Sequence, residues 1–219
     1  MLDLQTFAKT SLQHQPYTWS GVPHSLQESS LPALVESYPS QGFVEAKKEG
    51  AADSKQYHFE VRHLVVKDQV QEGVKALSPV WQALINELRS PAYRETMQRL
   101  SGLDLSAHVL DIGFFQFQRG HWVAPHTDHL TKSLTHVFYF NPHWEQDWGG
   151  ALRILNGKDS HAVHRELPPR QGHSAVIVRS DHSWHMVTPV ASAAQWPRRT
   201  LQVEFWKQPS QPASPPHAG

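Results

Sequence analysis

The sequence predicts a mainly β protein with flanking helices, arranged as a sandwich or barrel. From about residue 107, the chain forms short segments rich in β-branched and aromatic residues, which favour strands. Turn-forming pairs such as Gly149-Gly150 and Asn156-Gly157 separate these segments. Many short strands between turns are typical of sandwiches and barrels, and a chain of 219 residues can fold as one such domain. The expected strands span 109–118, 134–140, 151–155, 174–179 and 200–206.

The first 105 residues have a mixed character and predict three helices. Each predicted helix begins at a serine followed by proline or an apolar residue, a typical helix start. These helices are expected from about 31 to 39, from 78 to 88, and from 90 to 100, where Gly102 ends the last one. We therefore expect one domain over 1–208, with helical or mixed support in 1–105 and the strand-rich core in 106–208. The Pro- and Ser-rich segment 209–219 is expected to be a disordered tail.

Composition excludes several kinds of partner and chemistry. Lys and Arg total 20 and Asp and Glu also total 20, so no net field attracts nucleic acid or an anionic membrane. Cysteine is absent, which excludes disulfides, thiolate catalysis and iron–sulfur clusters and fits a cytoplasmic location. The N-terminal residues lack the pattern of a signal peptide, and no apolar run is long enough to span a membrane. We expect no nucleic-acid and no membrane partner.

The most informative pattern is His126-Thr127-Asp128, followed much later in the chain by His185. Alternate residues of a strand point to the same side, so His126 and Asp128 can face one ion. A distant strand can then supply His185. Two imidazoles and one carboxylate form the three-ligand face of a non-haem iron site, which leaves positions open for a cosubstrate and oxygen.

Other motifs follow in a fixed order from Gly120 to Trp206. They are Gly120-x-Trp122-x-x-Pro125-His126-Thr127-Asp128, Phe138-Tyr139-Phe140-Asn141, Trp148-Gly149-Gly150-Ala151-Leu152-Arg153, His185-x-Val187-x-Pro189-Val190 and Arg198-Arg199-Thr200-Leu201. In this order the segment resembles the Fe(II)/2-oxoglutarate-dependent oxygenases, specifically their prolyl-4-hydroxylase-like branch. The resemblance implies a double-stranded β-helix, or jelly-roll, core with His126, Asp128 and His185 as catalytic metal ligands.

The resemblance also implies where the cosubstrate binds. The family uses a basic residue after the second histidine to bind the far carboxylate of 2-oxoglutarate, and Arg198 holds that place. Arg199 should point to the opposite face of the strand. Tyr139 falls where relatives support the same carboxylate. Where some relatives have another tyrosine, this chain has Gln116 or Phe117, which leaves the contact at the keto-acid end undefined.

The implied activity is a 2-oxoglutarate-dependent dioxygenase that hydroxylates an unactivated C–H bond and releases succinate and CO₂. Its cofactors are Fe(II), 2-oxoglutarate and O₂, with ascorbate as a supporting reductant. Asp128 favours hydroxylation because halogenating relatives have a small residue at that position. Two other classes stay open: a zinc hydrolase with the same three ligands, and a non-catalytic jelly-roll binding module.

The substrate is the least defined part of the prediction. A small molecule or an amino-acid-like compound is favoured because the chain carries no added recognition domain, and a prolyl or other protein side chain stays open. Trp122 and Trp184 adjoin the ligand-bearing segments and are candidates to line the substrate pocket, as is Arg153. Histidines near the motifs are expected at the surface or beside ligands, rather than as ligands; these are His121, His129, His136, His173 and His182.

Overall fold

The computed structural model describes residues 1–50 and 55–208, so the predicted tail at 209–219 lies outside the described residues. Its α-helices are α1 (Leu4–Lys9), α2 (Leu31–Glu36), α3 (Pro79–Leu88) and α4 (Pro91–Ser101). Short 3-10 helices are η1 (Glu28–Ser30), η2 (Glu72–Val74) and η3 (Gln146–Trp148). The three predicted helices are confirmed as α2, α3 and α4, whereas α1 was not expected. No helix in the described part of the chain is long and apolar enough to cross a membrane.

The ends of α4 show how local sequence sets a helix boundary. The Ser90 hydroxyl accepts a hydrogen bond from the Tyr93 backbone N–H at 3.2 Å, which satisfies one of the free amides of the first turn. At the other end Gly102 has a φ of 72°, a left-handed conformation that glycine adopts without a steric penalty.

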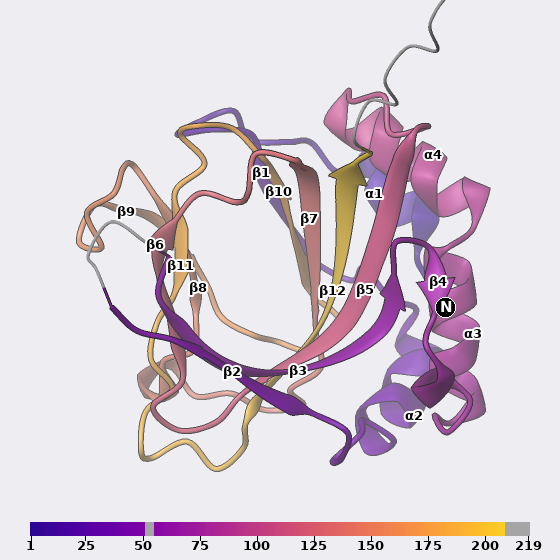
Figure 1. Cartoon of the computed structure of the whole chain (residues 1–219), viewed down its shortest axis with the longest axis horizontal. Helices are drawn as coiled ribbons and strands as arrows, with labels where there is room; N and C mark the ends of the chain where they lie inside the picture. The colour runs from indigo at the N-terminus through magenta and orange to yellow at the C-terminus, as the bar shows by residue number, and fades with distance from the viewer. Residues whose placement is uncertain (51–54, 209–219) are drawn as a thin grey trace, which may run out of the picture.

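The strands form one antiparallel sheet that curves into a nearly closed barrel (Figure 1). Its strands are β1 (Trp19–Val22), β2 (Val44–Lys48), β3 (Tyr57–Val66), β4 (Gln69–Val70), β5 (His108–Phe117), β6 (Trp122–His126), β7 (Lys132–Tyr139), β8 (Leu152–Leu155), β9 (Val163–Leu167), β10 (Ser174–Val178), β11 (His185–Val187) and β12 (Arg198–Lys207). Their order is β1-β10-β7-β12-β5-β3-β6-β11-β8-β9, and β2 and β4 each pair with β3. This architecture confirms the predicted jelly-roll fold.

The two end strands of the sheet, β1 and β9, face each other. A Cβ added at Gly21 of β1 would lie 3.3 Å from the Cδ2 atom of Leu167 in β9. The rings of Trp19 and His164 also meet edge to face, with centroids 6.1 Å apart. Side chains therefore complete the barrel where the backbone ladder stops.

The sequence led us to expect the strand-rich core within residues 106–208. In the structure this core also includes strands from the N-terminal half. Strand β3 pairs with both β5 and β6, and β1 pairs with β10. The N-terminal half therefore supplies central and terminal strands as well as helices. Residues 57–61 of β3 do alternate between apolar and polar, a strand signal that the sequence analysis did not use.

The helices cover one outer face of the sheet (Figure 1), and the largest apolar cluster lies between them. Trp81 of α3 packs edge to face on Phe114 of β5 at 4.7 Å and on Phe140 at 4.8 Å. Leu84 and Leu88 of the same helix are fully buried. This face supplies the apolar burial that stabilises the sheet, while the opposite face of the same strands lines the interior of the barrel.

Candidate metal centre

His126 and His185 meet because their strands pair directly. In the ladder between β6 and β11, His185 lies opposite His126, and the ring centroids are 4.2 Å apart. The next pair is Val187 with Val123, so the register shifts by one residue between the two pairs. This irregularity turns both Val123 and His126 toward the barrel interior.

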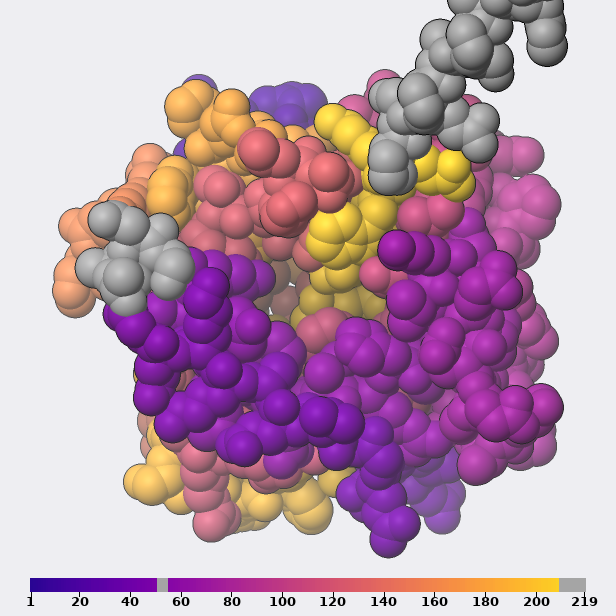
Figure 2. All heavy atoms as spheres, viewed as in Figure 1, coloured from indigo at the N-terminus to yellow at the C-terminus, as the bar shows by residue number. Residues whose placement is uncertain are grey.

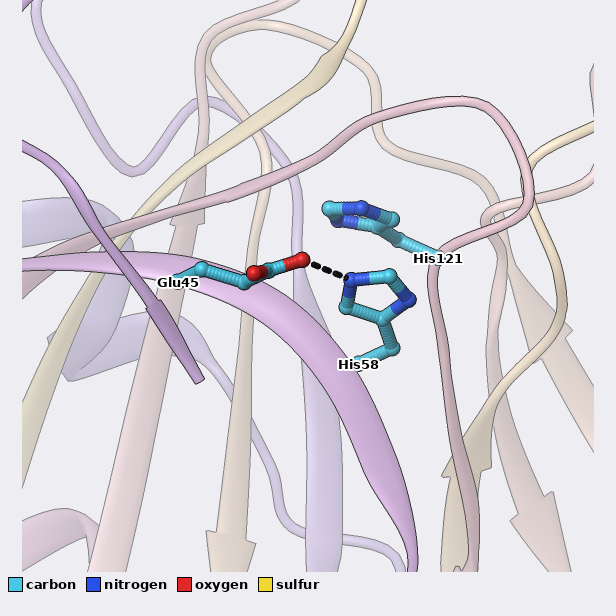
Figure 3. A group of neighbouring side chains, drawn as sticks. All are labelled: Glu45, His58 and His121. Carbon is cyan, nitrogen blue, oxygen red and sulfur yellow. Dashed lines mark hydrogen bonds and ion pairs between the residues drawn. The ribbon is translucent and has the colours of Figure 1, made fainter. Parts of the chain in front are cut away.

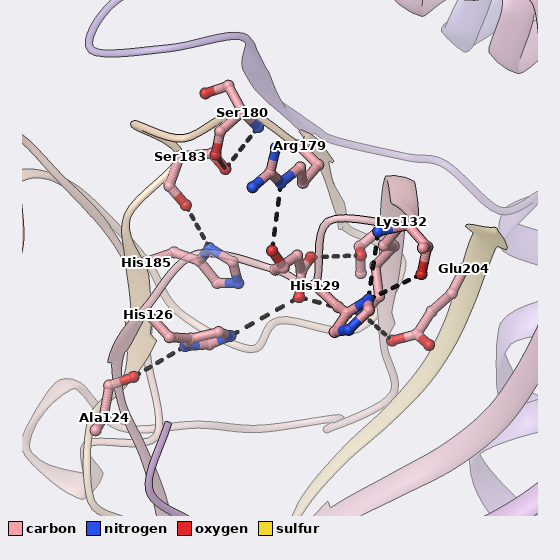
Figure 4. A network of polar contacts seen from close by, with 12 residues as sticks. Ala124, His126, His129, Lys132, Arg179, Ser180, Ser183, His185 and Glu204 are labelled. Carbon is pink, nitrogen blue, oxygen red and sulfur yellow. Dashed lines mark hydrogen bonds and ion pairs between the residues drawn. The ribbon is translucent and has the colours of Figure 1, made fainter. Parts of the chain in front are cut away.

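Hydrogen bonds to the backbone fix the tautomer of both histidines. The Nδ1 of His126 lies 2.9 Å from the Ala124 carbonyl, and the Nδ1 of His185 lies 2.9 Å from the Ser183 carbonyl (Figure 4). A carbonyl only accepts, so each Nδ1 carries the proton and donates it. Each Nε2 is left with a free lone pair, the arrangement that metal-ligating histidines need.

Asp128 completes the group. Its Oδ1 lies 3.9 Å from the Nε2 of His126, and one potential ligand atom from each of the three residues lies within 4.8 Å of the others. Thr135 donates its hydroxyl to Oδ2 at 2.8 Å, which orients the carboxylate. All three side chains are buried. The structure therefore brings together the three residues that the sequence predicted as metal ligands.

Lys132 and Glu204 also belong to this site, although sequence analysis missed both. The Nζ of Lys132 donates to Asp128 Oδ1 at 3.1 Å and to Glu204 Oε1 at 2.7 Å (Figure 4). It also lies 4.9 Å from the centroid of the Trp206 ring. The Lys132 side chain is only 8% exposed, so this cation holds two carboxylates in place inside the barrel.

The electrostatics of the group favour metal binding. Burial alone would raise the pKa of Asp128, but the neighbouring cations, above all Lys132, hold it well below its usual range. Burial lowers the pKa of His126 and of His185, so both rings are neutral at physiological pH. An ionised carboxylate beside two neutral imidazoles is the protonation state in which these groups ligate a metal.

A cavity of about 280 Å³ opens from this group, with its mouth on the face shown in Figure 2. There a recess separates the violet N-terminal segment from the red and yellow segments. Besides the three metal-ligand candidates, the cavity is lined by nine aromatic or aliphatic side chains and by six polar or charged ones, Lys55, Lys132, Thr135, Arg198, Gln202 and Glu204. The apolar lining comprises Tyr57, Phe59, Phe115, Phe117, Val123, Val137, Leu152, Ile177 and Val187.

Arg198 lies in the same cavity and has no anionic partner in the described part of the chain. It is 1% exposed, and its Nε and Nη1 atoms are buried without a hydrogen-bond partner. Burial lowers its pKa. Because a buried, unpaired charge is costly, this guanidinium requires an anion, and its planar fork suits a carboxylate.

Two aromatic rings surround that guanidinium. The Cζ of Arg198 lies 4.8 Å from the centroid of Phe117 and 5.4 Å from that of Tyr139. The Tyr139 hydroxyl is also buried without a hydrogen-bond partner, so it offers a second donor to the same anion. Phe117, not Gln116, faces the cavity, since Gln116 donates to Glu60 at 2.6 Å. Where some relatives have a tyrosine, this chain therefore places Phe117, which has no hydroxyl group.

Arg199 lies on the opposite face of β12. Its guanidinium carbon lies 5.4 Å from the centroid of the Tyr38 ring, in the layer between the sheet and the helices. Strand alternation thus separates two consecutive arginines, and only Arg198 reaches the cavity.

The three residues proposed for the substrate pocket do not line this cavity. The register shift in β6 directs Val123 inward, which leaves Trp122 pointing outward. Trp184 precedes the inward-facing His185 and therefore points away from the cavity. Arg153 forms an ion pair with Glu166 at 2.7 Å across β8 and β9. The expected role of Trp122, Trp184 and Arg153 in substrate binding therefore stays a prediction that this cavity does not support.

Comparison with known proteins identifies a family for the strand-rich segment. Residues 112–206 match the family model described as the 2OG-Fe(II) oxygenase superfamily. No curated protein matches the chain.

Solved structures share the fold at low sequence identity. A Pseudomonas putida prolyl-4-hydroxylase has a TM-score of 0.61 and 18% identity, covering 94% of this chain and 97% of that one. A Trichoplax adhaerens prolyl hydroxylase, in complex with a hypoxia inducible factor peptide fragment, has a TM-score of 0.52 and 16% identity, covering 93% and 87%. The alpha ketoglutarate dependent epimerase SnoN from nogalamycin biosynthesis has a TM-score of 0.54 and 11% identity, covering 93% and 81%.

Proposed function

We propose that this chain is a 2OG-Fe(II) oxygenase, the superfamily whose model matches residues 112–206, and that it hydroxylates an unactivated C–H bond of a small, amino-acid-like molecule. The family implies Fe(II), 2-oxoglutarate and O₂. The residues present fit this set, because the His126, Asp128 and His185 group offers a neutral–anionic–neutral donor set.

The observation that carries the proposal is the buried, unpaired guanidinium of Arg198 in the cavity of the metal group. A dicarboxylate would bind with one end at the metal group and the other at Arg198. The mechanism of a zinc hydrolase does not require a buried arginine such as Arg198. A non-catalytic binding module does not require the three metal ligands. Both alternatives from the sequence are therefore less well supported than the oxygenase.

Each part of the site has a separate task. When bound, the iron and 2-oxoglutarate would supply the oxidising chemistry of the reaction. His126, Asp128 and His185 hold the ion, and Thr135 and Lys132 fix the carboxylate of Asp128. Arg198 and Tyr139 orient the cosubstrate, and the aromatic cavity wall excludes water.

The size of the cavity favours a small substrate. Its volume of about 280 Å³ lies just below the usual range of about 300–1,000 Å³ for ligand pockets, and the cosubstrate would occupy part of it. The remaining space admits a small molecule or a single narrow side chain. Lys55 also lines the cavity, is exposed and forms no ion pair with another described residue, so its ammonium group can bind a substrate carboxylate.

A protein side chain is the second candidate. Two of the similar structures are prolyl hydroxylases, one of them with a bound peptide, whereas SnoN is an epimerase from a biosynthetic route. A prolyl ring on a peptide could also enter the cavity from its open mouth (Figure 2).

The proposal is tested by measuring succinate formed from 2-oxoglutarate in the presence of Fe(II), ascorbate and O₂. Free amino acids and small carboxylic acids form one panel, and prolyl-containing peptides form another. We expect a member of the first panel to stimulate succinate release and to gain one oxygen atom by mass spectrometry. The matched control is Asp128→Ala, which should abolish both signals.

Stimulation by peptides alone would replace the small-molecule assignment with the second candidate. Failure of every compound to stimulate succinate release, together with zinc-dependent hydrolysis of an ester or amide by the same chain, would overturn the oxygenase assignment.

A further inference from the structure

A second group of potential metal ligands lies on the outer surface of the barrel and comprises Glu45, His58 and His121 (Figure 3). It lies on the opposite face of β3 from the cavity. Tyr57 and Phe59 of that strand line the cavity, so the alternate residue His58 points outward. The group is therefore separate from the site of the proposed function.

Strand pairing places the three residues together. In the ladder of β2 and β3, Lys47 lies opposite His58, which puts Glu45 two residues along on the same face. In the ladder of β3 and β6, His58 lies opposite Trp122, and His121 directly precedes that residue. Three separate segments thus contribute one side chain each.

The side chains are already close. Glu45 Oε1 lies 2.6 Å from His58 Nε2, and the rings of His58 and His121 stack with centroids 3.8 Å apart. One ligand atom from each residue lies within 4.8 Å of the others. Figure 3 shows the His121 ring over the His58 ring, with the Glu45 carboxylate reaching toward both from one side.

His121 is an imidazole without a hydrogen-bonding role in the described structure. Its side chain is buried, with 7% exposure, and its Nδ1 has no hydrogen-bond partner. Burial lowers its pKa, and the adjacent His58 lowers it further. A buried polar nitrogen normally has a partner, so the unpaired Nδ1 of His121 calls for an explanation.

The surrounding charges suit a divalent cation. Glu60 lies two residues from His58 on the same face of β3, where Gln116 and Gln118 hold its Oε2 at 2.6 and 3.0 Å. Glu45 and Glu60 together balance two positive charges. The nearest lysine on this face, Lys47, is paired with Glu49 at 3.2 Å.

We propose that Glu45, His58 and His121 form a second divalent-metal site, with Zn²⁺ as the ion that best matches two imidazoles and one carboxylate. Tetrahedral zinc holds its nitrogen and oxygen ligand atoms about 3.3 Å apart, as its bond lengths of about 2.0–2.1 Å require. The Glu45–His58 contact must therefore open by about 0.7 Å. The Glu45 side chain is 64% exposed and can make this movement, while the two rings, tilted by 29°, turn further apart.

The site would act as a clamp on the cavity wall. An ion bound there joins β2, β3 and the turn before β6 on their outer face. Strand β3 carries Tyr57 and Phe59 on its inner face, and both line the cavity. We therefore assign a structural role to this ion, independent of the iron site.

The experiment uses the full untagged chain carrying His126→Ala and His185→Ala, which removes the first metal group. Dialysis against buffered zinc, followed by metal analysis, should show one bound zinc per chain. Adding Glu45→Gln should weaken zinc binding by at least about 10-fold. Even residues that only hydrogen-bond to a metal ligand typically change the affinity by this factor when they are substituted. His63→Ala, which alters an exposed histidine of the same strand, should retain the zinc.

Thermal unfolding supplies a second measurement. Zinc should raise the unfolding temperature of the chain lacking the first metal group but not that of the Glu45→Gln variant. Glu45 is exposed, so Glu45→Gln should keep the fold. We prefer it to His121→Ala, because His121 is buried and its substitution could disturb the fold. Absence of zinc from the parent chain, or equal zinc binding with and without Glu45→Gln, would overturn the proposal.

Discussion

The two faces of β7 and β12 carry opposite chemistries. Toward the helices these strands bury Leu134, Phe138, Leu201, Val203 and Phe205. Toward the cavity the same strands present Lys132, Thr135, Arg198, Gln202 and Glu204. A period of two therefore lets one strand stabilise the fold with one set of residues and hold charges in place with the next. Buried polar groups, not buried apolar ones, distinguish the functional face.

The largest expected effect is on the cavity face. In the metal-free protein, Lys132→Met leaves Asp128 and Glu204 without their shared cation, which should lower the free energy of unfolding by about 3–5 kcal/mol. Chemical denaturation measures this change. A divalent metal should restore part of the loss, because the ion replaces a positive charge beside Asp128.

The control for this change is Lys75→Met, which removes an exposed lysine paired with Glu72. It should leave stability almost unchanged. Equal effects of the two lysine substitutions would mean that the cavity face contributes no buried ion pair.

A comparable effect is expected on the helix face. Leu84→Ala creates a cavity beneath α3 and should cost about 2–5 kcal/mol of unfolding free energy. Asn86→Ala on the exposed side of the same helix should change stability by less than about 0.5 kcal/mol. The folded Leu84→Ala protein should keep its affinity for 2-oxoglutarate, measured by calorimetry, since the residue is remote from the cavity. A loss of affinity would show that the two faces are not independent.

Substitution of the neighbouring residues Arg198 and Arg199 compares the two faces of β12 directly. Arg198→Ala removes a charge-assisted bond worth about 1.5–3 kcal/mol, so the 2-oxoglutarate concentration for half-maximal succinate release should rise about 10- to 100-fold. Arg198→Lys should recover part of that loss. Arg199→Ala should leave the requirement unchanged. The reverse result would place Arg199 in the cavity and contradict the register of β12.

A pH-dependent effect concerns His136, a polar residue on the helix face. Its Nδ1 lies 2.8 Å from the Tyr93 hydroxyl, and burial lowers its pKa to about 3. Between that value and the unfolded pKa of about 6.5, only the unfolded chain binds the proton, so stability falls as pH falls. The slope due to this residue should approach about 1.4 kcal/mol per pH unit.

His136→Gln should remove this slope. Unfolding free energies of both proteins, measured from pH 7 to pH 4, give the difference between their pH profiles, in which the shared contributions of other histidines cancel. Parallel profiles would mean that the ring is protonated in the folded state.

Sequence patterns predicted the site wherever strand alternation alone decides it. The period of two predicted that His126 and Asp128 share one face and that Arg198 and Arg199 lie on opposite faces, while the family resemblance indicated Arg198 as the inward one. The same rule, extended along β12, would have placed Glu204 in the cavity, because it lies six residues after Arg198. Lys132 gave no such signal, since only the folded structure brings it between two carboxylates.

Trp122 shows why the remaining positions could not be predicted. Regular alternation puts it on the same face as His126, but the register shift between β6 and β11 reverses its direction. Irregularities of this kind depend on the partner strand, which lies far away in the sequence. Strand β3, by contrast, does carry a period-two pattern from Tyr57 to Val61, with outward-facing His58 and Glu60 as its polar positions.

The facing of β1 and β9 has a consequence for solubility. An end strand offers unpaired amides and carbonyls to any neighbouring chain, which is a common route to aggregation. Here side chains of the two end strands meet, through the Trp19–His164 ring contact and the approach of Leu167 to Gly21, although most of β9 is exposed to solvent. Strand β9 also carries Arg165 and Glu166, and charged side chains disfavour the addition of a further strand. The sheet therefore protects its own ends without closing its backbone ladder.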